Sequence, residues 1–209
     1  MKRVIDLLNE AIGILNEIKS GNKNVLKVEL STLRAGEVFK IDKHDFIVLE
    51  QYEGITKVIL KDFMAANVVF DERTRDYSKS KIREKIETDI LPVIENAVGA
   101  DNIVEHEVSL KSVDFQKEFE NVKCKVRLIT FEEARIYNNY IVNDELDDWW
   151  WSCTPWSTEK RGYNRSVAVV SPSGSIYDDD CDYVLGVRPV CILKSNIFVS
   201  KGEQVDGQI

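Results

Sequence analysis

The chain has 209 residues, of which 44% are hydrophobic and 31% charged, and its net charge is −8 at pH 7. These proportions are typical of a globular protein and exclude wholesale disorder and a fibrous repeat. The acidic balance argues against direct binding to nucleic acid, which needs basic surfaces to displace counterions from phosphates. No apolar run approaches the length of a membrane span, and Met1–Arg3 is followed by an amphipathic stretch instead of a signal core. We therefore expect a cytoplasmic protein that does not enter a membrane.

Residues 1–22 have the pattern of an amphipathic helix that ends near Gly21. Its apolar seam repeats at spacings of three and four residues and consists of Ile5, Leu8, Ile12 and Leu15. Such a helix can pack on its own domain or pair with another copy, because two heptads are marginal as an isolated coiled coil. Homo-oligomerisation through residues 4–18 is therefore one of our predictions.

The next segments are predicted to be a β-meander and a helix. Between residues 25 and 60 the apolar residues recur with a period of two, and a turn around Gly54 separates two of the runs. Residues 78–97 repeat isoleucine at every fourth position, which favours a helix. Ser78 or Ser80 can cap this helix, and Pro92 interrupts it or begins a second one.

Residues 103–122 alternate weakly and are rich in charge, so we expect a surface excursion with a short helix over residues 113–119. Residues 126–129 then predict a strand. Thr130 and Glu133 have the spacing of a capping box that opens a helix. No Pro, Gly or Ser-rich linker divides the chain. We therefore predict a single α+β domain over residues 25–200, with short antiparallel strands and two flanking helices, followed by a flexible tail over residues 201–209.

The cysteines and histidines do not form a recognisable metal or catalytic motif. None of the four cysteines belongs to a CxxC pair, and their apolar surroundings predict small core residues at Cys124, Cys153, Cys181 and Cys191. A bridge between Cys153 and Cys181 stays open at this point. His44 and His106 lie in polar stretches, where we expect them to face solvent. Nucleophile, phosphate-loop and dinucleotide motifs are missing from the sequence, so we predict that the chain is not an enzyme and binds no cofactor.

Four islands of unusual composition carry a resemblance to a known family. They read LITFEEARIY, WWWSCTPW, AVVSPSGSI and GVRPVCIL, over residues 128–137, 149–156, 168–176 and 186–193. In this order they resemble a domain of unknown function that is common in Firmicutes and their phages, with the signature WWLRSP followed by GVRPAL. The resemblance spans residues 30–199. The chain departs from the signature where Ser152 and Cys153 replace the leucine and the arginine.

The Gly-Val-Arg-Pro ending is also similar to the last strand of C-type-lectin-like folds, including formylglycine-generating-enzyme-like domains and the variable proteins of diversity-generating retroelements. This resemblance implies a C-type-lectin-like fold that displays a ligand face on irregular loops. It also implies a phage or prophage association, with the protein in the host cytoplasm or in a virion. We expect structural roles for Trp150, Gly186, Arg188 and Pro189.

Arg188 stands between Val187 and Pro189, a poor place for a free charge. We expect it to be partly buried and held by carbonyls or by a carboxylate, the candidates being Asp147, Asp148 and Glu133.

Aromatic, arginine and small polar residues gather between the tryptophans and the Gly-Val-Arg-Pro segment, a composition typical of recognition surfaces. We predict that loops 152–166 and 177–184 contact a ligand through Trp156, Arg161, Tyr163, Asn164, Tyr177, Asp178, Asp179, Asp180 and Tyr183. The aspartates lack the alternating ladder of a calcium loop, so we expect a solvated or partner-facing acidic patch and no metal.

These observations favour a non-catalytic binding module that recognises a protein or a glycan. One alternative is an acidic phage accessory protein that inhibits a host defence or a nucleic-acid-binding system. A second alternative is an enzyme of the formylglycine-generating kind.

Overall fold

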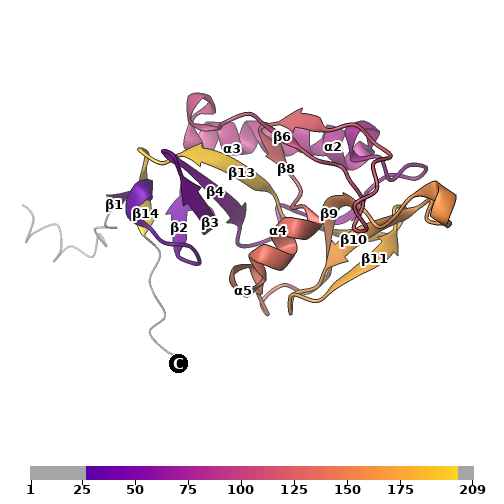
Figure 1. The fold of residues 1–209 in the computed structure, drawn as a ribbon. Coiled ribbons are helices and arrows are strands. Elements are labelled where there is room, and N and C mark those ends of the chain that lie inside the picture. Colours follow the sequence, from indigo (N-terminus) through magenta and orange to yellow (C-terminus); the bar gives the residue numbers. More distant parts are fainter. Residues whose placement is uncertain (1–26, 202–209) are drawn as a thin grey trace, which may run out of the picture.

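The computed structural model describes residues 27–201, which form a mixed α+β fold rich in strands. The helix predicted within residues 1–22 lies outside the described residues. The predicted tail also lies outside them, except for Lys201, which is the last residue of a strand. Figure 1 shows the sheets in the middle of the described part, with helices along two of its sides.

The larger sheet has seven strands, and all of its pairings are antiparallel. In spatial order the strands are β1 (Lys27–Glu29), β14 (Phe198–Lys201), β2 (Val38–Ile41), β3 (His44–Tyr52), β4 (Ile55–Leu60), β13 (Val190–Lys194) and β8 (Val126–Arg127). The predicted meander is confirmed for β2, β3 and β4, which pair in sequence order. β1 pairs instead with β14, because the 3₁₀ turn η1 (Leu30–Thr32) separates it from the meander.

The second sheet has five strands and is mixed. Its spatial order is β11 (Ile176–Asp180), β10 (Ser166–Val170), β9 (Trp150–Pro155), β12 (Val184–Val187) and β5 (Ala65–Val69), with β12 parallel to β9. β10 and β11 form a hairpin whose turn contains Gly174, and the φ of +83° at this residue is one that glycine adopts without strain. A short third ladder pairs β6 (His106–Val108) with β7 (Val122–Cys124).

The helix predicted over residues 78–97 is a composite of shorter pieces. They are η2 (Tyr77–Lys79), α2 (Lys81–Lys85), the π-helical η3 (Ile86–Ile90) and α3 (Leu91–Val98), followed by η4 (Ala100–Asn102). Ser80 caps α2, and Pro92 lies in the first turn of α3. An α-helix would rotate a four-residue repeat by about 40° at each step. The wider π turn counteracts this rotation, so that the isoleucine side chains at 82, 86, 90 and 94 are all buried.

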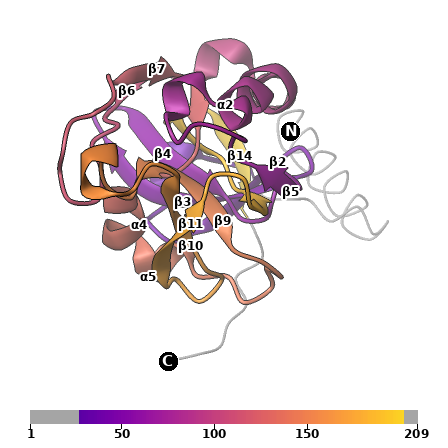
Figure 2. The same cartoon turned by 90° about the vertical axis from the view of Figure 1, so that its right-hand side faces the viewer.

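Two hydrophobic clusters cover opposite faces of the tryptophan strand β9. Trp151 belongs to the larger cluster, together with the isoleucines of α2 to α3, whereas Trp150 belongs to a second cluster. The second cluster is completed by residues of α4 (Phe131–Ile136) and α5 (Asn138–Ile141). The predicted capping box at Thr130 begins α4. Figures 1 and 2 accordingly show α2 and α4 on different sides of the strands.

The prediction of a helix over residues 113–119 is wrong. The chain between Val108 and Val122 is irregular, and Leu110 and Ser112 within it are buried. Ser112 bonds through its backbone and hydroxyl to Gln116, and Phe115 adopts a positive φ of 61°. The bonds between Ser112 and Gln116 take the place of the backbone hydrogen bonds that a helix would have made in this segment. We call residues 109–121 the strap, because they bond to Pro155 at the end of β9 and to the loop that follows it.

Candidate binding surface

The two predicted recognition loops have different boundaries from those expected. Ser152–Pro155 belong to β9 and are buried, so the first loop is limited to residues 156–165. Tyr177, Asp178, Asp179 and Asp180 lie on the strand β11, and only the turn 181–183 follows before β12. The prediction that residues 177–180 belong to a loop is therefore wrong, because these residues pair with β10 and their successive side chains alternate between the faces of the sheet.

Exposed and half-buried aromatic side chains lie on the first loop, on β11 and on the turn that follows β11, and two of these rings are in contact. The ring of Trp156, which is half-buried, lies 6.3 Å from the ring of Tyr177. Tyr177 is 65% exposed, Tyr183 is 59% exposed and Tyr163 is 40% exposed. We call these four residues the aromatic surface. Asn164 lies in the same loop and is exposed as well.

Both arginines of the first loop are engaged in ion pairs within the chain. Arg161 donates to the carboxylate of Asp114. Arg165 pairs with Asp182 at 2.5 Å and with Asp180 at 3.9 Å, and thereby joins the loop to the β11–β12 turn. Arg161 is therefore an anchor of the loop in addition to any contact with a ligand.

The strap holds the first loop through residues that the sequence did not single out. Asp114 accepts hydrogen bonds from Ser112, Ser157 and Arg161, and Glu118 accepts the backbone N–H of Glu159 at 3.3 Å. Burial of the Asp114 carboxylate raises its pKa, but the three donors outweigh this effect and lower the pKa to about 2. The loop 156–165 is therefore held by the carboxylate of Asp114, which stays ionised at neutral pH.

Asp178 and Asp179 differ from the other aspartates of this region. Within residues 27–201 neither of them forms an ion pair. Burial raises the pKa of Asp179, and the neighbouring carboxylates raise it further. No group of three or more metal-ligating side chains occurs in the part of the chain that the structure describes.

The four residues expected to be structural lie at the crossing between the two sheets. Arg188 and Pro189 connect β12 of the five-stranded sheet directly to β13 of the seven-stranded sheet. Trp150 and Arg188 are completely buried. A Cβ atom on Gly186 would lie only 2.5 Å from the ring of Phe63, so a larger residue would displace that ring.

Of the two kinds of partner expected for Arg188, backbone carbonyls bind it and the candidate carboxylates do not. Its Nε donates to Leu60 O at 2.7 Å and its Nη1 to Ile141 O at 2.5 Å. Burial lowers the pKa of Arg188 to about 10, so the guanidinium remains charged at neutral pH. Glu133, one of the three predicted partners, pairs instead with Arg127. Among the described residues, Nη2 of Arg188 and Nε1 of Trp150 have no hydrogen-bond partner.

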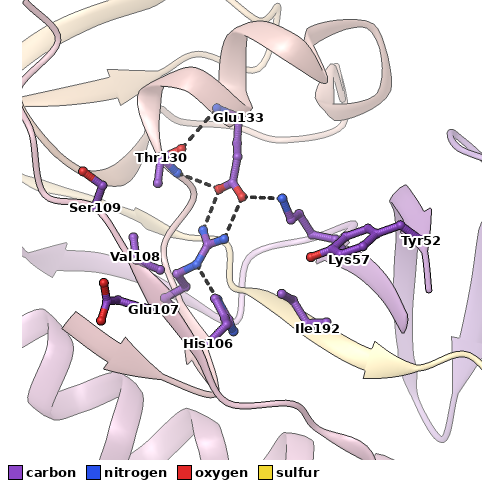
Figure 3. Close-up of a pocket in the computed structure, with 10 residues that line it drawn as sticks. Tyr52, Lys57, His106, Glu107, Val108, Ser109, Thr130, Glu133 and Ile192 are labelled. Carbon is purple, nitrogen blue, oxygen red and sulfur yellow. Dashed lines mark hydrogen bonds and ion pairs between the residues drawn. The ribbon is translucent and has the colours of Figure 1, made fainter. Parts of the chain in front are cut away.

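A polar pocket of about 240 Å³ lies away from the aromatic surface, and none of the predicted ligand-contacting residues lines it. Figure 3 shows Glu133 in this pocket between Lys57 and the capping residue Thr130. Arg127 binds Glu133 through two nitrogens at 2.6 and 2.7 Å and donates through Nε to His106 Nε2 at 2.8 Å.

These contacts join four elements, namely β4, β6, β8 and α4. Burial of Glu133 raises its pKa, but Arg127 and Lys57 together bring the pKa far below its usual range. Because Arg127 and Glu133 use their hydrogen-bonding groups on each other and on neighbouring chain segments, the network acts as a clamp with little capacity left for a ligand.

His106 is a member of this clamp, and the expectation that it faces solvent is wrong. The residue is half-buried, and its Nδ1 bonds to Val104 O at 3.2 Å. Burial and the nearby Arg127 charge lower the pKa of His106 to about 4. The sequence context of His106 is acidic, so only the tertiary structure, which brings Arg127 of β8 to the His106 ring, reveals this contact.

All four cysteines are free and buried, which decides against the Cys153–Cys181 bridge. Burial raises the pKa of Cys124 to about 11 and that of Cys191 to about 12, and the pKa values of Cys153 and Cys181 are raised as well. The thiolate forms that redox or nucleophilic chemistry requires are therefore disfavoured at neutral pH.

Comparison of the chain with protein-family models, with curated protein sequences and with solved structures gave no match. Within residues 27–201, no helix has the length and apolar character needed to cross a membrane.

Proposed function

We propose that this protein is a non-catalytic binding module that recognises a protein or a glycan through the aromatic surface. The observation that carries the proposal is the pair formed by Trp156 and Tyr177, in which Tyr177 remains 65% exposed. Exposed aromatic rings with few rotatable bonds give large contact areas at low entropic cost, which suits recognition of another molecule.

The way in which the surface is supported agrees with this role. The strap fixes the loop 156–165 through Asp114 and Glu118, and Arg165 ties it to the β11–β12 turn. A surface held in this way loses little conformational freedom when it binds.

The C-type-lectin-like fold and the phage or prophage origin are part of the same proposal. Support for the fold comes from the Gly-Val-Arg-Pro segment, which leads from β12 to β13, and each of these strands is paired on both sides within its own sheet. Support for the origin rests on the four sequence islands alone.

Tyr177→Ala tests the proposal, with Phe198→Ala as a matched control. Both rings are highly exposed, but Phe198 lies on β14 of the other sheet. Each variant and the wild type are applied to a glycan array and to an immobilised bacterial lysate, and bound species are quantified. We expect specific ligands to be lost with Tyr177→Ala and retained with Phe198→Ala. Equal binding by all three proteins would contradict the proposal.

A further inference from the structure

β11 is the outermost strand of the five-stranded sheet, so one of its edges pairs with no other described strand. Its inner edge is paired with β10 over the whole length, from Ile176 to Asp180. The free edge of a strand presents N–H and C=O groups that a strand of another chain can pair with. The aromatic surface thus adjoins an open backbone edge.

The bonds at the two ends of the β10–β11 ladder fix which groups point inward. Cys181 donates its N–H to Arg165 O at 3.0 Å, and Ser171 donates its N–H to Ser175 O at 2.9 Å. In antiparallel strands, hydrogen-bonded pairs alternate with pairs whose N–H and C=O groups point away from each other. Every second pair between these two bonds is therefore hydrogen-bonded.

By this alternation Tyr177 and Asp179 bond to β10, whereas Ile176, Asp178 and Asp180 direct their backbone groups to the open edge. Asp179 Oδ1 already accepts the N–H of Asp180 at 2.9 Å. The outward N–H groups of Ile176 and Asp178 remain for a partner strand, as do the outward C=O groups beside them.

The charge along this edge selects the partner. Arg165 compensates Asp180 and Asp182, but within the described chain Asp178 and Asp179 have no cationic neighbour in an ion pair. A strand with lysine or arginine opposite these two residues would gain favourable cross-strand pairs. A second copy of β11 in a symmetric antiparallel pair would instead place Asp178 opposite Asp178, which is destabilising.

We propose that the open edge of β11 binds an extended, basic segment of a partner protein as an added strand. The inference rests on the proposed function, because Tyr177 of the aromatic surface projects from the same strand. Backbone hydrogen bonds from Ile176 and Asp178 supply the pairing, and Asp178 and Asp179 supply the preference for basic side chains.

Two variants of one residue separate backbone pairing from charge. Asp178→Pro removes an outward N–H without removing a bond to β10, and proline is tolerated at such an edge position. Asp178→Asn removes the same charge but keeps the N–H. The probe is a fluorescein-labelled peptide of alternating lysine and threonine, titrated into the full chain by fluorescence anisotropy. A second peptide is N-methylated at alternate residues, which blocks its strand edge.

We expect the unmodified peptide to bind the wild type and the N-methylated peptide to fail. Asp178→Pro should weaken binding about tenfold more than Asp178→Asn does, because it removes a hydrogen bond as well as the charge. Amide hydrogen exchange should slow at Ile176 and Asp178 when the peptide binds. Equal affinities of the two variants, equal binding of both peptides, or no binding to the wild type would each overturn strand addition.

A further comparison keeps this inference distinct from the proposed function. Any ligand found with the glycan array or lysate is tested against Tyr177→Ala and Asp178→Pro. Loss with both variants supports strand addition. Loss with Tyr177→Ala alone keeps the aromatic surface as the binding site and overturns only the strand. Loss with neither variant overturns both proposals.

Discussion

The guanidinium carbon of Arg188 lies 5.1 Å from the centre of the Trp150 ring, and both side chains are completely buried. Arg188 also donates hydrogen bonds to Leu60 at the end of β4 and to Ile141 at the end of α5. Because Arg188 directly follows β12, one side chain joins the two sheets and a helix at their crossing. We therefore expect Arg188 to stabilise the fold.

Arg188→Ala should therefore destabilise the protein strongly. Two buried carbonyls would lose their donors and a cavity would open beside Trp150, a combined loss of about 3–5 kcal/mol. Urea denaturation measures the free energy of unfolding. Arg188→Lys should recover only part of the loss, because one ammonium cannot reproduce the planar fork that reaches both carbonyls. Wild-type stability of Arg188→Ala together with loss of ligand binding would assign Arg188 to the ligand instead.

The clamp around Arg127 should make stability depend on pH through His106. Its pKa of about 4 in the folded chain lies below the value of about 6.5 for an unfolded chain, so the unfolded state binds more protons between these values. The free energy of unfolding should fall by roughly 2 kcal/mol, after allowance for partial exposure, as the pH decreases from about 6.5 to about 4. Urea denaturation at several pH values measures this slope.

His106→Gln is the matched control for that slope. A glutamine oxygen can still accept the hydrogen bond from Arg127 but does not titrate. The variant should show a flatter dependence of stability on pH above about 5.3, because Glu133 in the unfolded chain begins to bind protons about one pH unit above its pKa of about 4.3. A slope identical to that of the wild type would rule out His106 as its source.

Asp114→Ala should loosen the loop 156–165, because Ser157 and Arg161 lose their common acceptor. Trypsin should then cleave after Lys160 or Arg161 about tenfold faster, as expected when hydrogen bonds that oppose local opening are removed. Glu120→Ala, which removes an exposed ion pair of the same strap with Lys117, should leave the rate unchanged. Equal cleavage of both variants would show that Asp114 does not hold the loop.

The double variant Trp156→Ala with Tyr163→Ala should keep its far-UV circular dichroism spectrum. Tyr163 is partly exposed and Trp156 is half-buried against Tyr177, so we expect a loss of about 1 kcal/mol, or a few degrees in melting temperature. Ligand binding should be weakened much more than stability. A drop of many degrees would identify the rings as core residues and remove them from the binding surface.

The predicted helix within residues 1–22 leads to a separate test. Sedimentation of the full chain is compared with that of a chain starting at Val25, which retains the whole of β1. If the seam of Ile5, Leu8, Ile12 and Leu15 pairs with a second copy, only the full chain should sediment as an oligomer. A monomer in both cases would contradict self-association through residues 4–18.

Features that the sequence determined by itself depend on neighbours within a few positions. The capping box of Thr130 and Glu133, the turn at Gly174 and the meander of β2 to β4 each follow from spacing along the chain. The opposite burial of Trp150 and Trp151 likewise follows from the alternation of an extended strand. Local geometry decides such features before any distant segment packs.

Only the tertiary structure decided which distant groups meet. Arg188 binds carbonyls, and since every residue carries one, no residue type marks Leu60 or Ile141 as its partners. Asp114 bonds to the loop 156–165 through Arg161, which is 47 positions away in the sequence, and it lies in a segment whose charge predicted only a surface excursion. Asp178, Asp179 and Asp180 lie on a strand with an open edge, because β11 pairs with β10 on one side only. That position depends on the order of strands in the sheet, which the local sequence does not reveal.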